Sequence, residues 1–196
     1  MKSFSKDTIN KIGNASIYMC ERIPSMSKTK LLKLLYLLEE HSVKEFQTPF
    51  FGIDFEVWQA GPVAKDIFID LSDDYQSPSM LNDYLVIKAA IDQSATYISA
   101  KASFNDDEFS DNDMSIMDCV IEKYGDKTAS WLVNFTHKKN TAWFVAAQKN
   151  KLLESFKAGI IKSSPIQIDF EYYLSGCDKA KYIDTKETWS AFENLK

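Results

Sequence analysis

The chain has 196 residues, of which 45% are hydrophobic and 26% charged, as in an ordinary globular protein. Its six glycines and five prolines are too few for a disordered or linker-rich chain, so we expect one domain, or one domain with a small appendage. Three widely spaced cysteines without a C-x-x-C pair argue against a disulfide framework and a zinc ribbon, and we expect them to be reduced, buried thiols: Cys20, Cys119 and Cys177.

The sequence indicates no targeting or membrane segment. The N-terminus lacks the apolar stretch of a signal peptide. The longest dense apolar run, Leu31–Leu38, is interrupted by Lys33 and is far shorter than the roughly 20 residues of a membrane span. We therefore expect a soluble, cytoplasmic protein without a membrane partner.

Charge is distributed unevenly along the chain. Residues 1–44 contain eight basic and four acidic residues, whereas residues 54–118 contain three basic and fourteen acidic residues. An acidic middle segment repels the phosphates of nucleic acids and attracts a basic protein partner. An ordinary solvated surface explains the same charges.

Two helices are predicted at the start of the chain. The first covers Thr8–Arg22, with Ser5 or Asp7 as its N-cap. The second covers Lys28–His41 and is capped by Ser27. Because leucines and a tyrosine surround nearly its whole circumference, this second helix is expected to be the buried centre of the fold.

A strand, a turn and a third helix are predicted next. Aromatic and β-branched residues alternate with polar ones over Phe51–Trp58, which is typical of a strand. Gln59–Gly61 is predicted to be a turn, and Pro62–Leu71 a helix, with the proline in its first turn. Trp58 is interpreted either as a packed core side chain or as an exposed anchor for a partner.

The middle of the chain contains weaker signals. Residues 80–91 are ambiguous, and a short helix is one interpretation. Tyr97–Phe104 alternates as a strand does. Ser110 and Asp113 resemble a capping box for a helix that continues to Tyr124 and ends at Gly125.

Short helices are predicted for the rest of the chain. Thr128–His137 and Thr141–Gln148 read as helices, and Ile166–Leu174 as either extended or helical. We therefore predict a predominantly α-helical α+β fold: a compact helical domain around a buried central helix, with a small antiparallel β element. This single domain is expected to span residues 1–176, and residues 177–196 to form a polar tail with a weak amphipathic helix capped by Thr185.

No catalytic, cofactor-binding or metal-binding site is predicted. The sequence has no Walker loop, no G-x-S-x-G, no G-x-G-x-x-G and no H-x-x-x-H pattern. A Cys119 and His137 pair would place the thiol among core residues. The acidic turn Asp106, Asp107 and Glu108 lacks the spacing of a calcium loop, so a solvated loop is the preferred interpretation.

Three motif features have a structural interpretation, and the first also has a functional one. Gly61-Pro62-Val63 suits a tight turn into a helix, and the exposed amides of such a turn could also bind an anion. His137 is expected to bond to a helix C-terminus or to Thr141. Trp143 is expected to fill the core between two helices.

Two separated blocks together resemble the Panacea antitoxin domain family. The first block contains Lys30–Leu38 and, after the aromatic strand, Trp58–Val63; the second is Ser110–Trp143. The family pattern pairs a K-L-L-Y-L helix with W-x-x-G-P-V, then a helix ending in histidine with a tryptophan nearby. Ala60 and Ala142 stand where the family often has an aromatic residue and a proline. The resemblance extends over residues 9–144, and its motif residues are Lys30, Leu34, Tyr36, Trp58, Gly61, Pro62, Val63, His137 and Trp143.

The resemblance implies a function. Panacea proteins are phage-associated proteins and antitoxins, so it implies a non-enzymatic protein that neutralises a cognate protein toxin by direct binding, or acts as an adaptor that delivers it to a protease. The alternative is a nucleic-acid-associated regulator of the operon, suggested by the basic N-terminal segment but opposed by the acidic middle. The candidate partner-binding residues are Trp58, Asp106, Asp107 and Glu108.

Overall fold

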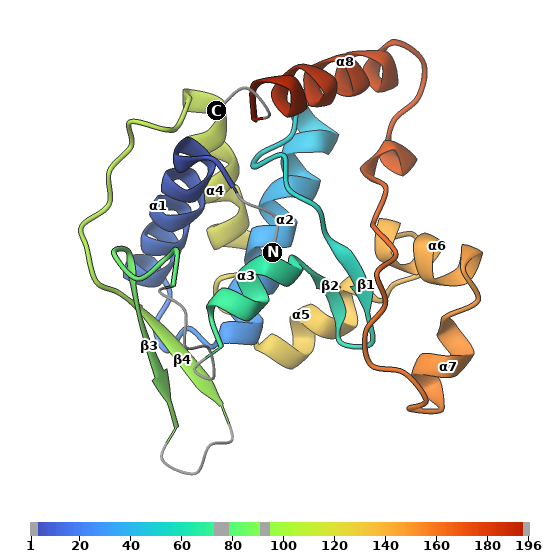
Figure 1. Ribbon diagram of the computed structural model, residues 1–196, viewed down its shortest axis with the longest axis horizontal. Coiled ribbons are helices and arrows are strands. Elements are labelled where there is room, and N and C mark those ends of the chain that lie inside the picture. The colour runs from blue at the N-terminus through green and yellow to red at the C-terminus, as the bar shows by residue number, and fades with distance from the viewer. Residues whose placement is uncertain (1–3, 73–78, 91–94, 194–196) are drawn as a thin grey trace.

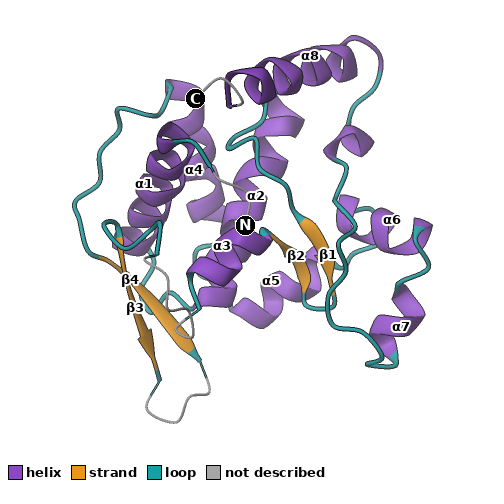
Figure 2. Cartoon of the chain, viewed as in Figure 1, coloured by secondary structure: helices purple, strands orange, loops and turns teal. Residues whose placement is uncertain are grey.

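The computed structural model describes residues 4–72, 79–90 and 95–193. Within these ranges the fold is predominantly helical, with two small antiparallel hairpins (Figures 1 and 2), as the sequence predicts. The elements in chain order are α1 Lys6–Arg22, α2 Lys28–Phe46, β1 Glu56–Trp58, β2 Gly61–Val63, α3 Lys65–Asp70, β3 Leu85–Ala89, β4 Thr96–Ala100, α4 Asp111–Tyr124, α5 Ala129–Thr136, α6 Ala142–Lys149, α7 Leu153–Lys157, the 3₁₀ turn η1 Phe170–Tyr173, and α8 Gly176–Glu193.

Helix α2 is the centre of the molecule, and every side chain from Leu31 to Glu40 is buried. The Ser27 hydroxyl accepts from the Lys30 amide and starts the helix, as predicted. The predicted end at His41 is wrong, because the helix continues for five more residues to Phe46. Gln47 then ends it in a left-handed conformation, with φ of 57°.

Helices α1 and α4 pack against α2 and against each other. Ser5 is the N-cap of α1, which starts two residues before the predicted Thr8. The predicted capping box at the start of α4 is confirmed, since Ser110 and Asp113 each bind the other's backbone amide. The Tyr18 hydroxyl donates to Asp118 over 2.6 Å and joins α1 to α4.

The first hairpin, β1–β2, differs from the prediction in two ways. Only the last three residues of the predicted Phe51–Trp58 strand pair with a partner. The Gly61–Val63 segment is a strand and not a helix start, so α3 begins only at Lys65. Pro62 is tolerated there because its pairing partner Val57 donates its amide away from β2, to the Ile166 carbonyl over 2.8 Å.

The second hairpin, β3–β4, replaces the short helix considered for residues 80–91. Leu85–Ala89 pairs with Thr96–Ala100, and residues 91–94 between them lie outside the described residues. The observed β4 is shorter than the predicted Tyr97–Phe104 strand. The Ile98 amide donates to the Met26 carbonyl over 2.8 Å, so the hairpin is held against the α1–α2 connection.

The C-terminal helix α8 is longer than the predicted tail helix. It starts at Gly176, and Thr185 lies inside it and bonds back to Lys181, so the predicted cap at Thr185 is wrong. In Figure 1, α8 lies across the end of α2. Lys181 donates to the Phe46 carbonyl over 2.9 Å, and Tyr182 is buried. None of the helices described is long and apolar enough to cross a membrane.

Candidate functional site

The two distant motif blocks meet at the turn of the β1–β2 hairpin. The Lys33 ammonium of α2 donates to the Pro62 carbonyl over 2.7 Å. The Trp143 indole N–H of α6 donates to the Trp58 carbonyl over 3.0 Å. We call these residues, together with Gln59, Gly61 and His137, the hairpin cluster. In it, side chains from two later helices and from α2 bind the backbone of one tight turn.

His137 binds the same turn from the end of α5. Its Nε2 lies 3.0 Å from the Gln59 carbonyl oxygen, and its Nδ1 faces the Val133 carbonyl in the last turn of α5. The ring also contacts the Trp143 ring, with centroids 3.9 Å apart. His137 thus bonds to a helix C-terminus but not to Thr141, which instead caps α6.

Gly61 is required by the geometry of this turn. Its φ is +95°, and a Cβ there would lie 2.7 Å from the Thr136 hydroxyl oxygen and 3.1 Å from the end of the Lys33 side chain. The suggested anion site is not formed, because Gly61 and Pro62 lie in β2 and not at a helix N-terminus. The Gly-Pro-Val motif is therefore a close-packed strand.

The Gly61→Ala variant is expected to lose at least about 1 kcal/mol more stability than Gly159→Ala. Both glycines have positive φ, but a Cβ at Gly159 would meet nothing within 4 Å. The difference between the variants therefore isolates the contact with Thr136 and Lys33. Urea unfolding of both variants measures it, and equal losses would show that the turn has room for a side chain.

Lys33 is a buried lysine without an acidic partner in the described contacts. Its exposed fraction is 1%, and burial lowers the pKa of its ammonium to about 7. In the sequence Lys33 stands out only as an interruption of the apolar run Leu31–Leu38, and it is not among the predicted site residues. The signal was present, because a lysine among leucines on a helix buried all round must bury its ammonium group.

The remaining motif residues are also internal. The Lys30 ammonium donates to the Gly125 carbonyl over 2.7 Å, and Leu34 and Val63 are buried. Tyr36 packs against Phe55 with ring centroids 5.5 Å apart. Its hydroxyl is buried and has no hydrogen-bond partner in the described part of the chain. These residues support the fold from inside.

The candidate partner residues are more accessible. Trp58 is half-buried: its ring packs against Phe68 with centroids 5.0 Å apart, and its N–H donates to Glu56. Asp106 and Asp107 are exposed, whereas Glu108 accepts from the Asn10 amide over 3.1 Å.

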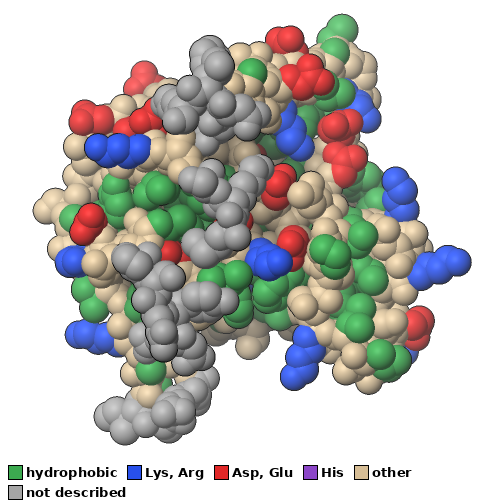
Figure 3. Space-filling model, in the orientation of Figure 1, with side chains coloured by type: hydrophobic (Ala, Val, Ile, Leu, Met, Phe, Trp, Pro, Cys, Tyr) green, Lys and Arg blue, Asp and Glu red, His purple; other side chains and the backbone are tan. Residues whose placement is uncertain are grey.

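The structure does not bring these candidates together. The contacts described for Trp58 are with β1, α3 and α6, whereas Glu108 of the acidic turn contacts α1. Figure 3 shows that acidic side chains gather along the upper edge of the visible face.

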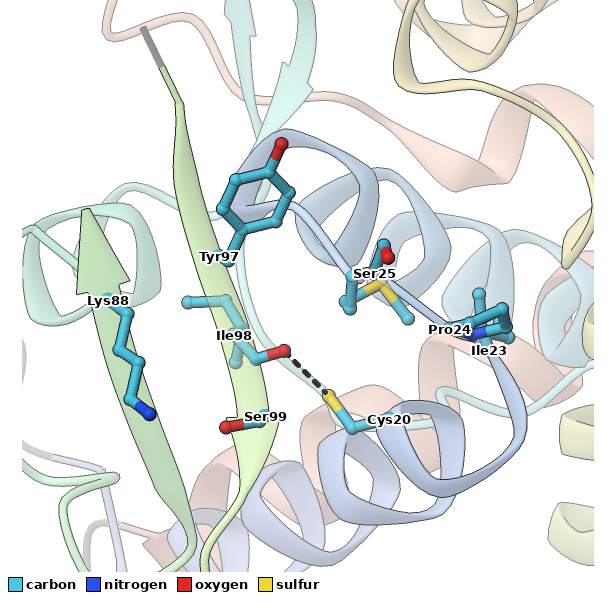
Figure 4. A pocket seen from close by; sticks show the side chains of 9 residues that line it. Cys20, Ile23, Pro24, Ser25, Lys88, Tyr97, Ile98 and Ser99 are labelled. Atoms are coloured by element: carbon cyan, nitrogen blue, oxygen red, sulfur yellow. Dashed lines mark hydrogen bonds between the residues drawn. The ribbon is translucent and has the colours of Figure 1, made fainter. Parts of the chain in front are cut away.

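A pocket of about 420 Å³ lies between the end of α1 and the β3–β4 hairpin (Figure 4). Cys20 faces it and contacts the Ile98 carbonyl at 3.9 Å. Burial raises the pKa of the Cys20 thiol to about 12, so this cysteine is protonated and a poor nucleophile.

Comparison with known families fits this arrangement. The family model described as Antitoxin SocA-like, Panacea domain, matches residues 31–144, more than half of the chain. The chain belongs to the Panacea domain family. No curated protein and no solved structure matches it significantly.

The Panacea match contains the whole hairpin cluster, from Lys33 to Trp143. All of α1, α7 and α8 lies outside it. The two departures from the family pattern, Ala60 and Ala142, are sequence neighbours of cluster residues. Ala60 is exposed in the turn. Ala142 is buried at the start of α6, where its amide donates to the Tyr173 hydroxyl. A proline at position 142 would lose that bond, because proline has no N–H.

Proposed function

We propose that this Panacea protein acts in the cytoplasm and neutralises a cognate protein toxin by binding it directly, without catalysis. The family match carries the proposal, because the family is one of antitoxins. The hairpin cluster supports a scaffold role for the motif, since Lys33, Trp143 and His137 bind backbone carbonyls of the chain itself. We therefore place the partner surface on accessible side chains other than these three.

The acidic turn is our first candidate for that surface. Asp106 and Asp107 are exposed and lie in the strongly acidic middle segment, which attracts a basic partner at long range. Trp58 is a second candidate contact, because its half-exposed ring is anchored by Phe68. We assign toxin binding to residues 1–176 and treat residues 177–196 as an appendage.

A role as a proteolytic adaptor is part of the same proposal. A toxin that is only blocked keeps its cellular lifetime, whereas a delivered toxin is degraded. Pulse-labelling of the toxin with and without this protein distinguishes the two modes.

The alternative role as a nucleic-acid-associated regulator is not favoured by the described contacts. Lys30 and Lys33, two lysines of the basic N-terminal segment, donate to carbonyls of the chain itself. Lys28 is half-buried and donates to the Ser72 hydroxyl. These lysines are therefore poorly placed to bind phosphates. A gel shift with the promoter region at moderate salt is expected to show no binding.

The direct test is co-expression with the product of the adjacent gene. The neighbour alone is expected to stop growth, and the pair to grow normally. A neighbour that is harmless alone, or that stays toxic beside this protein, would contradict the proposal.

The charge of the turn provides a second test. The Asp106→Lys, Asp107→Lys double variant is expected to associate with the toxin at least about tenfold more slowly at low salt. The matched control is Glu122→Lys, Glu187→Lys, which makes the same charge change at exposed positions on α4 and α8. Stopped-flow association rates measure the effect. Equal slowing of both variants would assign it to net charge and not to the turn.

A further inference from the structure

Three metal-ligating side chains come together away from the hairpin cluster, where the end of α2 packs against α4. His41 and Glu45 are one turn apart on α2, and Cys119 lies on α4. One ligand atom from each side chain lies within 4.8 Å of the other two. We propose that these three side chains bind a zinc ion, a property independent of toxin binding.

The chemistry of the three groups suits zinc. Imidazole nitrogen, thiolate sulfur and carboxylate oxygen are the ligand types that zinc prefers in proteins. A dication held by one thiolate and one carboxylate is neutralised by its own ligands, so the group carries no excess charge. As the metal binds, the Cys119 thiol loses its proton to solvent and the sulfur donates its electron pair to zinc.

The distances are close to those of a zinc site. Bond lengths of about 2.0 to 2.3 Å place tetrahedral ligand atoms roughly 3.3 to 3.7 Å apart. His41 Nδ1 and Glu45 Oε1 are already 3.4 Å apart. The separations from the Cys119 sulfur, at most 4.8 Å, would shorten by up to about 1 Å when the ion binds. The Glu45 side chain is 46% exposed and has the freedom to make this adjustment.

Tyr124 fixes the orientation of the histidine. The His41 Nε2 lies 3.2 Å from the Tyr124 hydroxyl, which leaves Nδ1 facing Glu45. Metal-binding histidines generally use their second ring nitrogen in such a hydrogen bond, which sets the ring orientation. Tyr124 is therefore a positioning residue for the site.

The site is accessible from solvent. Glu45 is exposed and Cys119 is half-buried, so an ion and a water molecule as fourth ligand can reach them. The neighbouring Lys123 interacts electrostatically with Cys119 and is itself exposed, so its ammonium can turn into solvent when the dication binds. Because two ligands come from α2 and one from α4, zinc would cross-link these helices.

The test uses the full chain, stripped of metal with a chelator and titrated with Zn²⁺ and with Co²⁺ as a spectroscopic probe. We expect one ion per chain, a higher Tm, and a thiolate-to-cobalt charge-transfer band. Cys119→Ser is expected to abolish the band and His41→Gln to weaken binding at least about a hundredfold. Tyr124→Phe is expected to weaken it about tenfold or more.

Control variants separate the site from surface binding. Cys177→Ser, which removes an exposed thiol of α8, is expected to leave the band and the zinc affinity unchanged. Glu45→Gln keeps the exposed position of the side chain and tests a second ligand if Cys119→Ser fails to fold. Unchanged zinc binding in His41→Gln and Glu45→Gln would identify an adventitious ion only, and the absence of any zinc-dependent rise in Tm would overturn the proposal.

Discussion

The stability of the protein relative to its Lys33→Met variant is expected to rise with pH between about 7 and 10.5. Burial lowers the pKa of Lys33 to about 7 in the folded protein, whereas the unfolded chain has the ordinary value of 10.5. Between these pH values Lys33 is protonated in the unfolded state and neutral in the folded state. Each pH unit therefore adds about 1.4 kcal/mol to the free energy of unfolding. Over the interval the gain is on the order of 4 kcal/mol.

Urea unfolding of both proteins across this pH range measures the effect, because other titrating groups cancel in the difference. Glu39→Gln is an informative control: burial raises the pKa of Glu39 from 4.5 to about 7, although its carboxylate accepts from the Phe51 amide. In this case the folded state holds the extra proton. The contribution of Glu39 to the free energy of unfolding therefore falls as pH rises from 4.5 to about 7. A pH-independent difference between wild type and Lys33→Met would show that Lys33 is solvated.

Trp143→Ala is expected to lower the free energy of unfolding by about 3 to 5 kcal/mol. The Trp143 side chain is 2% exposed, contacts His137 and donates to the Trp58 carbonyl, so truncation leaves a cavity and an unsatisfied carbonyl. Denaturant unfolding measures the loss.

Trp131→Ala is the matched control for this prediction. Trp131 is 39% exposed and stacks on Phe135, so its removal is expected to cost less than about 1 kcal/mol. Similar losses in the two variants would contradict the assignment of Trp143 to the hairpin cluster.

Residues that support the fold and residues that contact the partner can be told apart by experiment. Changes at Lys33, Gly61 or Trp143 are expected to reduce antitoxin activity by unfolding the protein. Changes at the acidic turn are expected to reduce activity with the fold intact. Measuring stability and activity on the same variants therefore distinguishes scaffold residues from contact residues.

Local signals in the sequence predicted much of the helical fold. Ser27 and the Ser110 capping box start their helices where expected, because a cap depends on residues only a few positions apart. The end of α2 differs from the prediction because the helix continues through Ser42 and Val43, which are buried in the fold. The helix propensity of the local sequence does not reveal which residues will be buried.

The hairpin was harder to predict than the helices. Pro62 fits a helix start by its fixed φ, and only the bond from the Val57 amide to the Ile166 carbonyl explains its place in a strand. That partner lies more than a hundred residues away in the sequence. The carbonyl contacts of Lys33 and Trp143 depend on the same tertiary packing.

The candidate zinc site could not be predicted because the predicted second helix ends too early. With the helix predicted to end at His41, Glu45 was not expected one turn further on the same face. Cys119 was read as a core thiol, whereas it is half-buried beside Lys123. Helix packing, and not sequence spacing, brings these three ligands together.

Direct binding of a toxin can be measured by mixing the purified protein with the purified product of the adjacent gene. Size-exclusion chromatography with light scattering then gives the mass of any complex. We expect a stable complex, whose formation is slowed in the Asp106→Lys, Asp107→Lys variant. Two separate peaks at micromolar concentrations, for a pair that grows normally when co-expressed, would contradict direct binding.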